Sequence, residues 1–585
     1  MKKIIKYGWF TVLVTLLFVN ISFVSSAEGT IIDSGSCGDE DNSILWTVYD
    51  NGELVISGEG EMENYSSSNE NMAPWYSYWR NVTNIKIESG VKSIGDEAFL
   101  YFTKVKSVSI PNTIEKIGMY AFDCCFSLTQ VEIPDSVLSI SEAAFINCDS
   151  LEKIIVNDAN LNYVSEGGIL FNKNKTVLLA FPASNGLNEY TMPNTVERIA
   201  VGAFCDCDKL LNINIGDNVK EIGQSAFEGC SGLTEFNITD KVIEVGDRAI
   251  YECSNLQTIH IGSSVEVLGY ECFADCPSIR AFNVSEENKC YSSDESGVLF
   301  DKEKKILIRY PSENKAEKYA LPETTEHISE EAFVMAHYLC EVVLPNSLKT
   351  IGAYAFENCT SLKSIEIPDS VTSIESYAFA FSGIETAKMS KNSDMGFAQF
   401  FCCTNLKDII IPEGVTSISY YAFDCCFSLK SVTIPHSVVF IDYLAFESCD
   451  AIEDVYYYGT EEEWEQIIIR SDNESLTRAN IHFLGFEEHE HSYVLVESVE
   501  PSCLIEGAMT YVCSCGDEYQ EIVKPKGHSF EDGSSKCSNC DYDRSFDCSC
   551  NCHKGGIAGF FFKIILFFQK LFRTNKTCAC GVAHY

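Results

Sequence analysis

Apolar and polar positions repeat in one pattern from about residue 85 to residue 457. The clearest copy, Ser127 to Cys148, reads SLTQVEIPDSVLSISEAAFINC; its skeleton is Leu-x-x-Val-x-Ile-Pro-x-x-Val-x-x-Ile, then Ala-Phe, then Cys three residues after the Phe. A fixed period of this length predicts a solenoid of stacked coils. The Phe or its replacement recurs, mostly at steps of 23 residues, at Phe99, Phe122, Phe145, Phe204, Phe227, Ile250, Phe273, Phe333, Phe356, Phe379, Phe400, Phe423 and Phe446.

Each repeat contains the elements of one coil. Apolar and polar residues alternate from Leu128 to Ile133, which predicts a short strand with one inward face, and Pro134 ends that strand because proline cannot donate to the ladder. Val137 and Ile140 point inward again, and Ala143-Ala144-Phe145 predicts a tight turn or one helical turn. The predicted fold class is an α/β-type repeat solenoid with a parallel β-sheet on one face.

Two steps of the repeat are longer than the others, from Phe145 to Phe204 and from Phe273 to Phe333. Both contain the same insert, which runs from Tyr163 to Pro182 and from Tyr291 to Pro311, and in each a short Asn/Asp-Lys loop lies between apolar residues. These inserts predict hairpins that protrude from the coil.

Caps are expected at both ends of the array. Near the N-terminus, Asp50-Asn51-Gly52 lies between two apolar runs and predicts a hairpin. The aromatic run from Pro74 to Trp79 then covers the first coil or, alternatively, exposes its rings to bind sugar. At the other end Thr460 precedes three glutamates and predicts a helix start, with Trp464 packed on the last coil.

The first residues have the features of a secretory signal: Lys2, Lys3 and Lys6, an apolar run and then Ser25-Ser26-Ala27. Cleavage after Ala27 is favoured over an uncleaved membrane anchor, although the apolar run approaches the length of a span. The domain boundaries predicted from these features are a signal peptide at 1–27, an N-terminal cap at 28–84, repeats at 85–452, a C-terminal cap at 453–487, small Cys/His-rich modules at 488–545 and a basic, apolar, Cys-rich tail at 546–585.

The formal net charge of −43 is spread along the repeats. It argues against nucleic acid as a partner, because phosphate contacts need clustered lysine and arginine. No enzyme motif, catalytic residue or cofactor site is assigned.

Most cysteines of the array occupy one position of the repeat. They are expected to stack inside the coils as small buried side chains with weak thiol donors, mostly reduced. Cys124, Cys402 and Cys425 come one residue earlier and should point elsewhere, and Cys402 and Cys425 are the best candidates for a cross-coil disulfide. The aligned set is Cys125, Cys148, Cys207, Cys230, Cys253, Cys276, Cys359, Cys403, Cys426 and Cys449.

The Ile-Pro-x-x-Val-x-x-Ile-x-x-x-Ala-Phe-x-x-Cys repeat resembles the BspA-like leucine-rich repeat family of bacterial and protist surface proteins, over roughly residues 85 to 483. The resemblance implies a leucine-rich-repeat-like stack in a secreted or surface-attached protein that adheres to host proteins, matrix or other cells. It supplies no catalytic residues. The alternatives are a structural spacer without a strong ligand and, less favoured, an extracellular enzyme.

A ligand of the strand face would meet the outward positions of the predicted strands. Asparagines on successive coils suit a polar ligand, although on a sheet surface such residues are more often only solvated, and no continuous aromatic or basic stripe is evident there. The positions are Glu132, Asn214, Asn237, His260, Asn283, Glu366 and Thr433, together with Ile155, Val343 and Ile410.

After His491 the composition changes. Cys537 and Cys540 could bind zinc with His528 and either Cys513 or Cys515, but Cys513-x-Cys515 is a poor second pair, so disulfides or free thiols are favoured and no metal site is assigned. The segment Gly559 to Arg573 has its cations near one stripe of an otherwise apolar helix and is too short to span, which favours an interfacial helix on a membrane surface over packing on the cysteine module.

Overall fold

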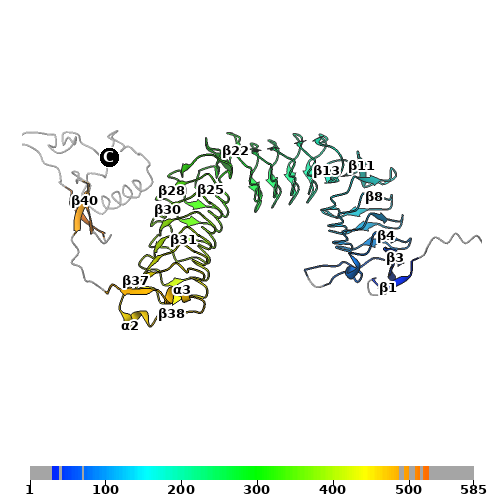
Figure 1. Cartoon of the computed structure of the whole chain (residues 1–585). Helices are drawn as coiled ribbons and strands as arrows, with labels where there is room; N and C mark the ends of the chain where they lie inside the picture. The colour runs from blue at the N-terminus through cyan, green and yellow to red at the C-terminus, as the bar shows by residue number, and fades with distance from the viewer. Residues whose placement is uncertain are drawn as a thin grey trace, which may run out of the picture. The chain divides into compact units, whose positions relative to one another are not determined.

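The computed structural model describes residues 29–37, 43–68, 71–485, 493–499, 507–513 and 518–525. The chain divides into two units, Met1–Phe486 and Glu487–Tyr585. The predicted solenoid forms in the first unit, where successive coils stack with their strands side by side (Figure 1).

Each coil contributes one longer strand to a parallel sheet, as predicted. The pairing is in register at the repeat distance, so that Ile154 lies beside Val131 and Ile259 beside Phe236. These strands are β4 (Asn84–Ile87), β6 (Ser107–Ser109), β8 (Gln130–Ile133), β10 (Lys153–Val156), β14 (Glu189–Thr191), β16 (Asn212–Asn214), β18 (Glu235–Ile238), β20 (Thr258–Ile261), β22 (Ala281–Val284), β26 (Lys318–Ala320), β28 (Glu341–Val343), β30 (Ser364–Glu366), β32 (Thr386–Lys388), β33 (Asp408–Ile410), β35 (Ser431–Pro435), β37 (Asp454–Tyr458) and β39 (Asn480–Phe483). Along strands such as β8 and β18, inward side chains are buried and the alternate ones face solvent.

A second parallel ladder of two-residue strands runs along another side of the coils, at the predicted second inward segment. Its strands pair over the same repeat distance, for example Ile117 beside Ile140. They are β5 (Ser93–Ile94), β7 (Lys116–Ile117), β9 (Ser139–Ile140), β15 (Arg198–Ile199), β17 (Glu221–Ile222), β19 (Glu244–Val245), β21 (Val267–Leu268), β27 (His327–Ile328), β29 (Thr350–Ile351), β31 (Ser373–Ile374), β34 (Ser417–Ile418), β36 (Phe440–Ile441) and β38 (Ile468–Ile469).

Aromatic rings of successive coils stack on one another in the core, in stretches separated at Ile250 and at the two long steps. Phe122 and Phe145 stack with centroids 5.5 Å apart and planes 5° from parallel, and Phe333 and Phe356 stack at 4.7 Å. At the two long steps the next stretch begins with residues of the inserts: Phe181 stacks on Phe204 at 4.9 Å and Tyr310 on Phe333 at 5.0 Å. We call these rings, with Ile250, the phenylalanine column. This column stabilises the stack mainly because each of its coils buries one large apolar side chain.

Both inserts form the predicted hairpins, but the prediction that they protrude is wrong. In the first, β11 (Tyr163–Glu166), β12 (Ile169–Asn172) and β13 (Val177–Ala180) are antiparallel neighbours, and β13 then joins the two-residue ladder. The second repeats this with β23 (Tyr291–Ser293), β24 (Leu299–Asp301) and β25 (Ile306–Arg309). Their apolar side chains close the core, and Phe171 and Phe300 are completely buried.

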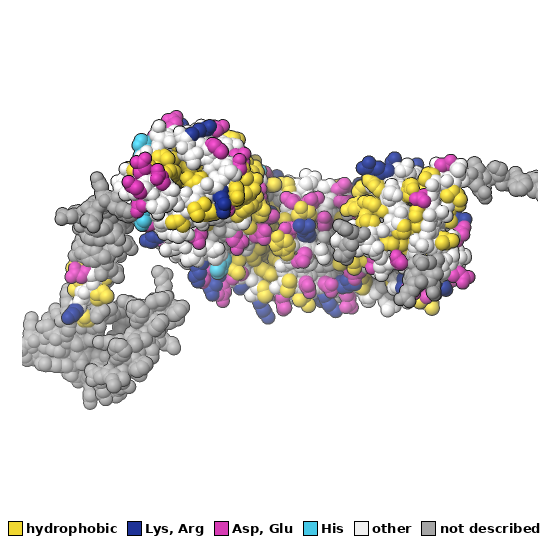
Figure 2. Space-filling model, turned by 90° about the horizontal axis from the view of Figure 1, so that it is seen from below, with side chains coloured by type: hydrophobic (Ala, Val, Ile, Leu, Met, Phe, Trp, Pro, Cys, Tyr) yellow, Lys and Arg dark blue, Asp and Glu magenta, His cyan; other side chains and the backbone are white. Residues whose placement is uncertain are grey.

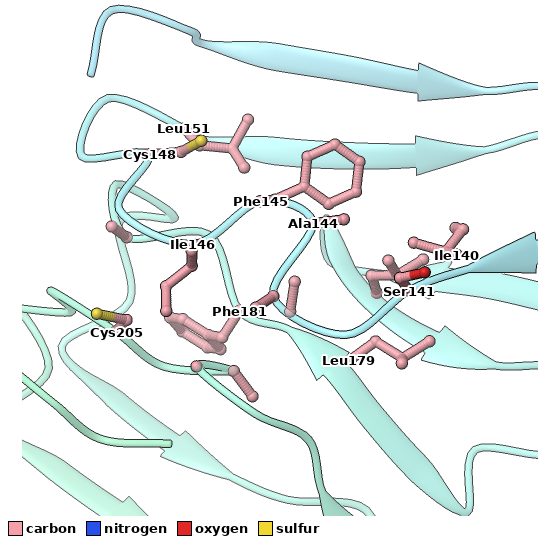
Figure 3. A pocket seen from close by; sticks show the side chains of 16 residues that line it. Ile140, Ser141, Ala144, Phe145, Ile146, Cys148, Leu151, Leu179, Phe181 and Cys205 are labelled. Carbon is pink, nitrogen blue, oxygen red and sulfur yellow. The ribbon is translucent and has the colours of Figure 1, made fainter. Parts of the chain in front are cut away.

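The buried side chains form three clusters that meet at these inserts. Figure 3 shows a small cavity at the first junction, where Phe145 and Phe181 lie on neighbouring turns with Ile146 close by. Because its lining is mostly apolar core residues, we interpret this cavity as a packing gap between two clusters.

The N-terminal cap forms as predicted. Strands β1 (Ile31–Ser36), β2 (Ile44–Tyr49) and β3 (Glu53–Gly58) are antiparallel, and β3 pairs with β4 of the repeats. After the cap strands comes the short helix η1 (Tyr76–Tyr78). Trp75 is fully buried and stacks on Phe99 at 5.8 Å, so this ring covers the first coil and is not available to a sugar.

In the C-terminal cap, Thr460 is the N-cap of α2 (Glu461–Trp464), where its side chain accepts from the Glu463 amide and Glu463 accepts from the Thr460 amide. Trp464 is buried against Tyr457, and α3 (Glu474–Thr477) follows.

The second unit contains an antiparallel sheet of β40 (Tyr493–Val499), β41 (Gly507–Cys513) and β42 (Glu518–Val523). The predicted signal peptide and tail, including Gly559 to Arg573, lie outside the described residues. Within the described ranges no helix is both long and apolar enough to cross a membrane.

Candidate functional site

The strand face presents the outward residues that the sequence predicted. Register places Asn237, His260 and Asn283 side by side on β18, β20 and β22. Polar contacts occupy many positions of this face: His260 lies 2.8 Å from Glu235, and the ion pairs Lys318–Glu341 and Lys388–Glu366 join neighbouring coils. The described strand face is therefore polar, and many of its charged side chains are paired with one another.

The apolar residues predicted on this face are also exposed. Ile155, Val343 and Ile410 are 37%, 42% and 64% exposed. They lie on different coils among mostly polar neighbours, so they do not form a continuous apolar patch.

The turn that contains each phenylalanine of the repeat differs in backbone conformation from the strands. The residues two positions before and two positions after the column residue have left-handed conformations, such as Tyr354 and Asn358 around Phe356 and Tyr377 and Phe381 around Phe379. Of the two predicted alternatives, the tight turn forms and the helical turn does not. We call this side of the coil stack the turn edge.

Hydrogen bonding explains why the left-handed residues are retained. The amides of Tyr354, Phe356 and Asn358 donate to carbonyls of the next coil at 3.0, 2.7 and 3.0 Å. Because right- and left-handed residues alternate, every second amide points along the stack and finds a partner.

Seven aromatic side chains form a connected cluster on the turn edge of neighbouring coils. Tyr354 stacks on Tyr377 at 5.1 Å, and Phe397 stacks on Tyr420 at 5.6 Å. Phe381 and Phe397 are 41% and 38% exposed, and the others are half-buried. Monomeric proteins seldom expose connected aromatic groups of this size unless they bind something. The turn-edge aromatic cluster consists of Tyr354, Tyr377, Phe381, Phe397, Phe401, Tyr420 and Tyr421.

Sequence reasoning missed this cluster because it searched the strand face for an aromatic stripe. The available signal was the recurrence of tyrosine two residues before the column phenylalanine, at Tyr354, Tyr377 and Tyr421. Residues separated by one repeat stack directly, so this period alone predicts ring contacts.

Carboxylates surround the aromatic cluster. Burial, followed by repulsion from Glu331, raises the pKa of Glu357, and burial also raises the pKa of Asp424. The turn segments 352–360, 375–383, 395–404, 419–427 and 442–449 contain Glu357, Glu375, Asp424, Asp442 and Glu447 and no lysine or arginine. The corresponding turn segments around Phe99, Phe122, Phe145, Phe204, Phe227, Phe273 and Phe333 also contain acids and no lysine or arginine, whereas the segment around Ile250 contains Arg248. On the face in Figure 2 acids and cations are interspersed.

Cys402 and Cys425 lie beside this cluster, with side chains within hydrogen-bonding distance of one another, and in the structure both are free thiols. Cys124, at the equivalent position, accepts from Asn147 at 3.7 Å. The prediction that these three cysteines point away from the core column is consistent with the half-buried positions of Cys402 and Cys425. Cys124 is an exception, because its residue is buried.

The aligned cysteines are buried and act as the predicted weak donors. Cys230 donates to the carbonyl of Phe204 at 3.1 Å and Cys359 to that of Phe333 at 3.1 Å, in each case the column residue of the preceding coil. Burial raises the pKa of Cys359 to about 12. Thiols with such raised pKa values are poor nucleophiles.

The described ranges contain no cluster of three or more His, Cys, Asp or Glu side chains suited to a metal ion. Of the zinc candidates, Cys513 ends β41, with no description of its side chain, and Cys515, His528, Cys537 and Cys540 lie outside the described residues. The zinc hypothesis therefore stays a prediction.

Comparison with solved structures identifies other repeat proteins. A leucine rich cell surface protein from Faecalibacterium prausnitzii is 24% identical, with a TM-score of 0.40 over 73% of this chain and 97% of that chain. A leucine-rich repeat protein from Eubacterium ventriosum is 26% identical, with a TM-score of 0.37 over 60% of this chain and 95% of that chain. The pneumococcal vaccine antigen PcpA is 18% identical, with a TM-score of 0.37 over 78% of this chain and 99% of that chain. None of the curated proteins matches the chain.

The model of the BspA type leucine rich repeat region matches residues 74–177, 178–294 and 320–453, in six copies. These ranges are more than half of the chain and contain the aligned cysteines, the first insert and the phenylalanine column apart from Tyr310; most of the second insert lies between them. The chain belongs to the BspA-type leucine-rich repeat family.

Proposed function

We propose that this protein is exported and displayed at the cell surface, where its coils bind proteins of a host, of the extracellular matrix or of other cells. The turn-edge aromatic cluster is the observation that carries the proposal. Its rings are connected and at least partly exposed, Phe381 and Phe397 most of all, and a regular hydrogen-bonded backbone holds them, so a partner can bind with little loss of conformational freedom. Family membership agrees with a surface repeat protein.

The geometry of the strand face supports the further proposal of a non-catalytic role. The polar groups of the strand face are spread over successive coils and paired with neighbours, so few converge on one point as catalysis requires. The aligned thiols of Cys230 and Cys359 are buried and donate to backbone carbonyls.

Retention at the cell surface is the role we propose for Gly559 to Arg573. An apolar helix whose cations face anionic lipid would associate with a membrane surface. Deleting residues 557–573 should release the protein into the medium, and unchanged cell association of the deleted form would contradict this role.

The binding proposal is tested with the full-length protein and purified extracellular-matrix and epithelial surface proteins. The edge variant Phe381→Ser with Phe397→Ser removes two exposed rings. The matched control Val343→Ser with Ile410→Ser removes two exposed apolar side chains from the strand face of the same stack. We expect saturable binding that the edge variant weakens and the control retains.

Two outcomes would contradict the proposal. Equal loss in the edge and control variants would mean that the turn edge is not the binding surface. Absence of saturable binding to every protein tested would favour a structural spacer.

A further inference from the structure

We infer that the turn-edge aromatic cluster binds a protein segment rich in arginine or lysine. This inference rests on the proposed function and adds the chemistry of the partner. The contacting rings, the charge around them and one internal contact support it.

The backbone shows that these rings occupy unfavourable positions. Tyr354, Tyr377, Phe381 and Tyr421 have φ values of 54°, 57°, 56° and 58°. Bulky residues are rare in this left-handed region, which glycine and asparagine adopt more readily. Asn147 and Gly229 occupy equivalent positions in other coils. The two positions are left-handed in the other repeats as well, and what distinguishes the coils of Tyr354 to Tyr421 is that several of these residues are aromatic and contact one another.

The negative charge around the rings favours a positively charged partner segment. The turn segments of the cluster contain acids and no lysine or arginine. These carboxylates favour a cationic partner over a neutral or anionic one.

An internal contact shows that a turn edge can hold a guanidinium. In the coil of Ile250, the Arg248 guanidinium lies 5.0 Å from the centroid of the Tyr251 ring and pairs with Glu271 at 2.5 Å. This combines a cation–π contact with an ion pair. In the coils of Tyr354 to Tyr421 the turn segments keep the rings and the carboxylates but have no such cation of their own. A partner arginine would supply it.

The test uses two fluorescent peptides of alternating arginine and glycine, one of them with citrulline in place of every arginine. Citrulline keeps the shape of arginine and removes the charge. By anisotropy at physiological salt, we expect the arginine peptide to bind the full-length protein about tenfold more tightly than the citrulline peptide. Replacing two rings by Tyr377→Leu and Phe397→Leu retains apolar area, removes the ring faces and should weaken binding roughly fivefold.

Charge-matched variants separate a site from general attraction to an acidic protein. Glu357→Gln with Glu375→Gln changes the turn edge, and Glu366→Gln with Glu385→Gln makes the same change in charge on strand-face residues that pair with Lys388 and Lys407. The first should weaken binding of the arginine peptide and the second should not. Equal binding of both peptides, or equal weakening by both double variants, would overturn the inference. Thermal melts of each variant establish that it is folded.

The two proposals fail in different ways. If surface proteins bind through the aromatic cluster but the arginine peptide does not, the cationic partner is wrong and the binding function stands. If neither binds through the cluster, both are wrong.

Discussion

The phenylalanine column and the turn-edge aromatic cluster use the same residue types two positions apart in the chain. Phe379 is completely buried and stacks on Phe356, whereas Phe381 is 41% exposed and contacts Phe401. The cysteines repeat the contrast, because Cys403 is completely buried and Cys402 is half-buried. The backbone position within the coil, and not the residue type, therefore decides whether a ring or thiol supports the fold or faces a partner.

The largest expected difference between the two regions is in stability. Phe356→Ala should lower the free energy of unfolding by about 3–5 kcal/mol, because it leaves a cavity between two stacked rings. Phe381→Ala should change it by only about 0.5 kcal/mol, since that ring is already partly in solvent. Denaturant unfolding followed by circular dichroism measures both, and similar losses would contradict the division between column and edge.

Alkaline pH should distinguish the Cys359 thiol of the column from the Cys402 thiol of the edge. Burial raises the pKa of Cys359 from its ordinary value of about 9 to about 12. The folded protein holds this proton more tightly than the unfolded chain, so the stabilisation is complete below pH 9 and is lost as pH rises towards 12.

Unfolding free energies measured between pH 8 and 10.5 test this linkage. Cys359→Ala should flatten the alkaline loss by up to about 1.4 kcal/mol per pH unit, and Cys402→Ala should flatten it less. An unchanged slope in the Cys359 variant would show that this thiol does not titrate with unfolding.

The smallest effect concerns two adjacent alanines of one coil. Ala143 has a φ of 57°, and glycine occupies the equivalent position at Gly202, so Ala143→Gly should stabilise the protein by up to about 1 kcal/mol. Ala144, its buried neighbour, is not left-handed, so Ala144→Gly should destabilise by about 0.5–1 kcal/mol. Thermal midpoints that shift in the same direction for both variants would contradict the alternating backbone.

Local signals account for what the sequence predicted correctly. The 23-residue period, the Asp50-Asn51-Gly52 hairpin and the capping position of Thr460 each depend on residues close together in the chain. The two-residue ladder was not predicted as strands, because a segment such as Ser139–Ile140 is too short to show alternation. The hairpin inserts were predicted, but their burial was not, since it depends on the clusters of core residues that meet there.

The candidate site was harder to predict for a physical reason. In a sequence, a left-handed backbone position is normally inferred from the presence of glycine or asparagine. Here tyrosine, alanine and glutamate occupy many of these positions. Because this backbone conformation was not evident from the sequence, the tyrosines before the column phenylalanines could not be assigned to one edge of the coil stack.

Hydroxyl-radical footprinting of the full-length protein, free and with a bound partner protein, tests the central claim most directly. It reports the solvent exposure of individual aromatic and aliphatic side chains. We predict that the partner protects Tyr354, Phe381 and Phe397 and leaves Val343 and Ile410 as reactive as in the free protein. Protection of the strand-face residues with unchanged oxidation of the turn-edge aromatic cluster would contradict the account.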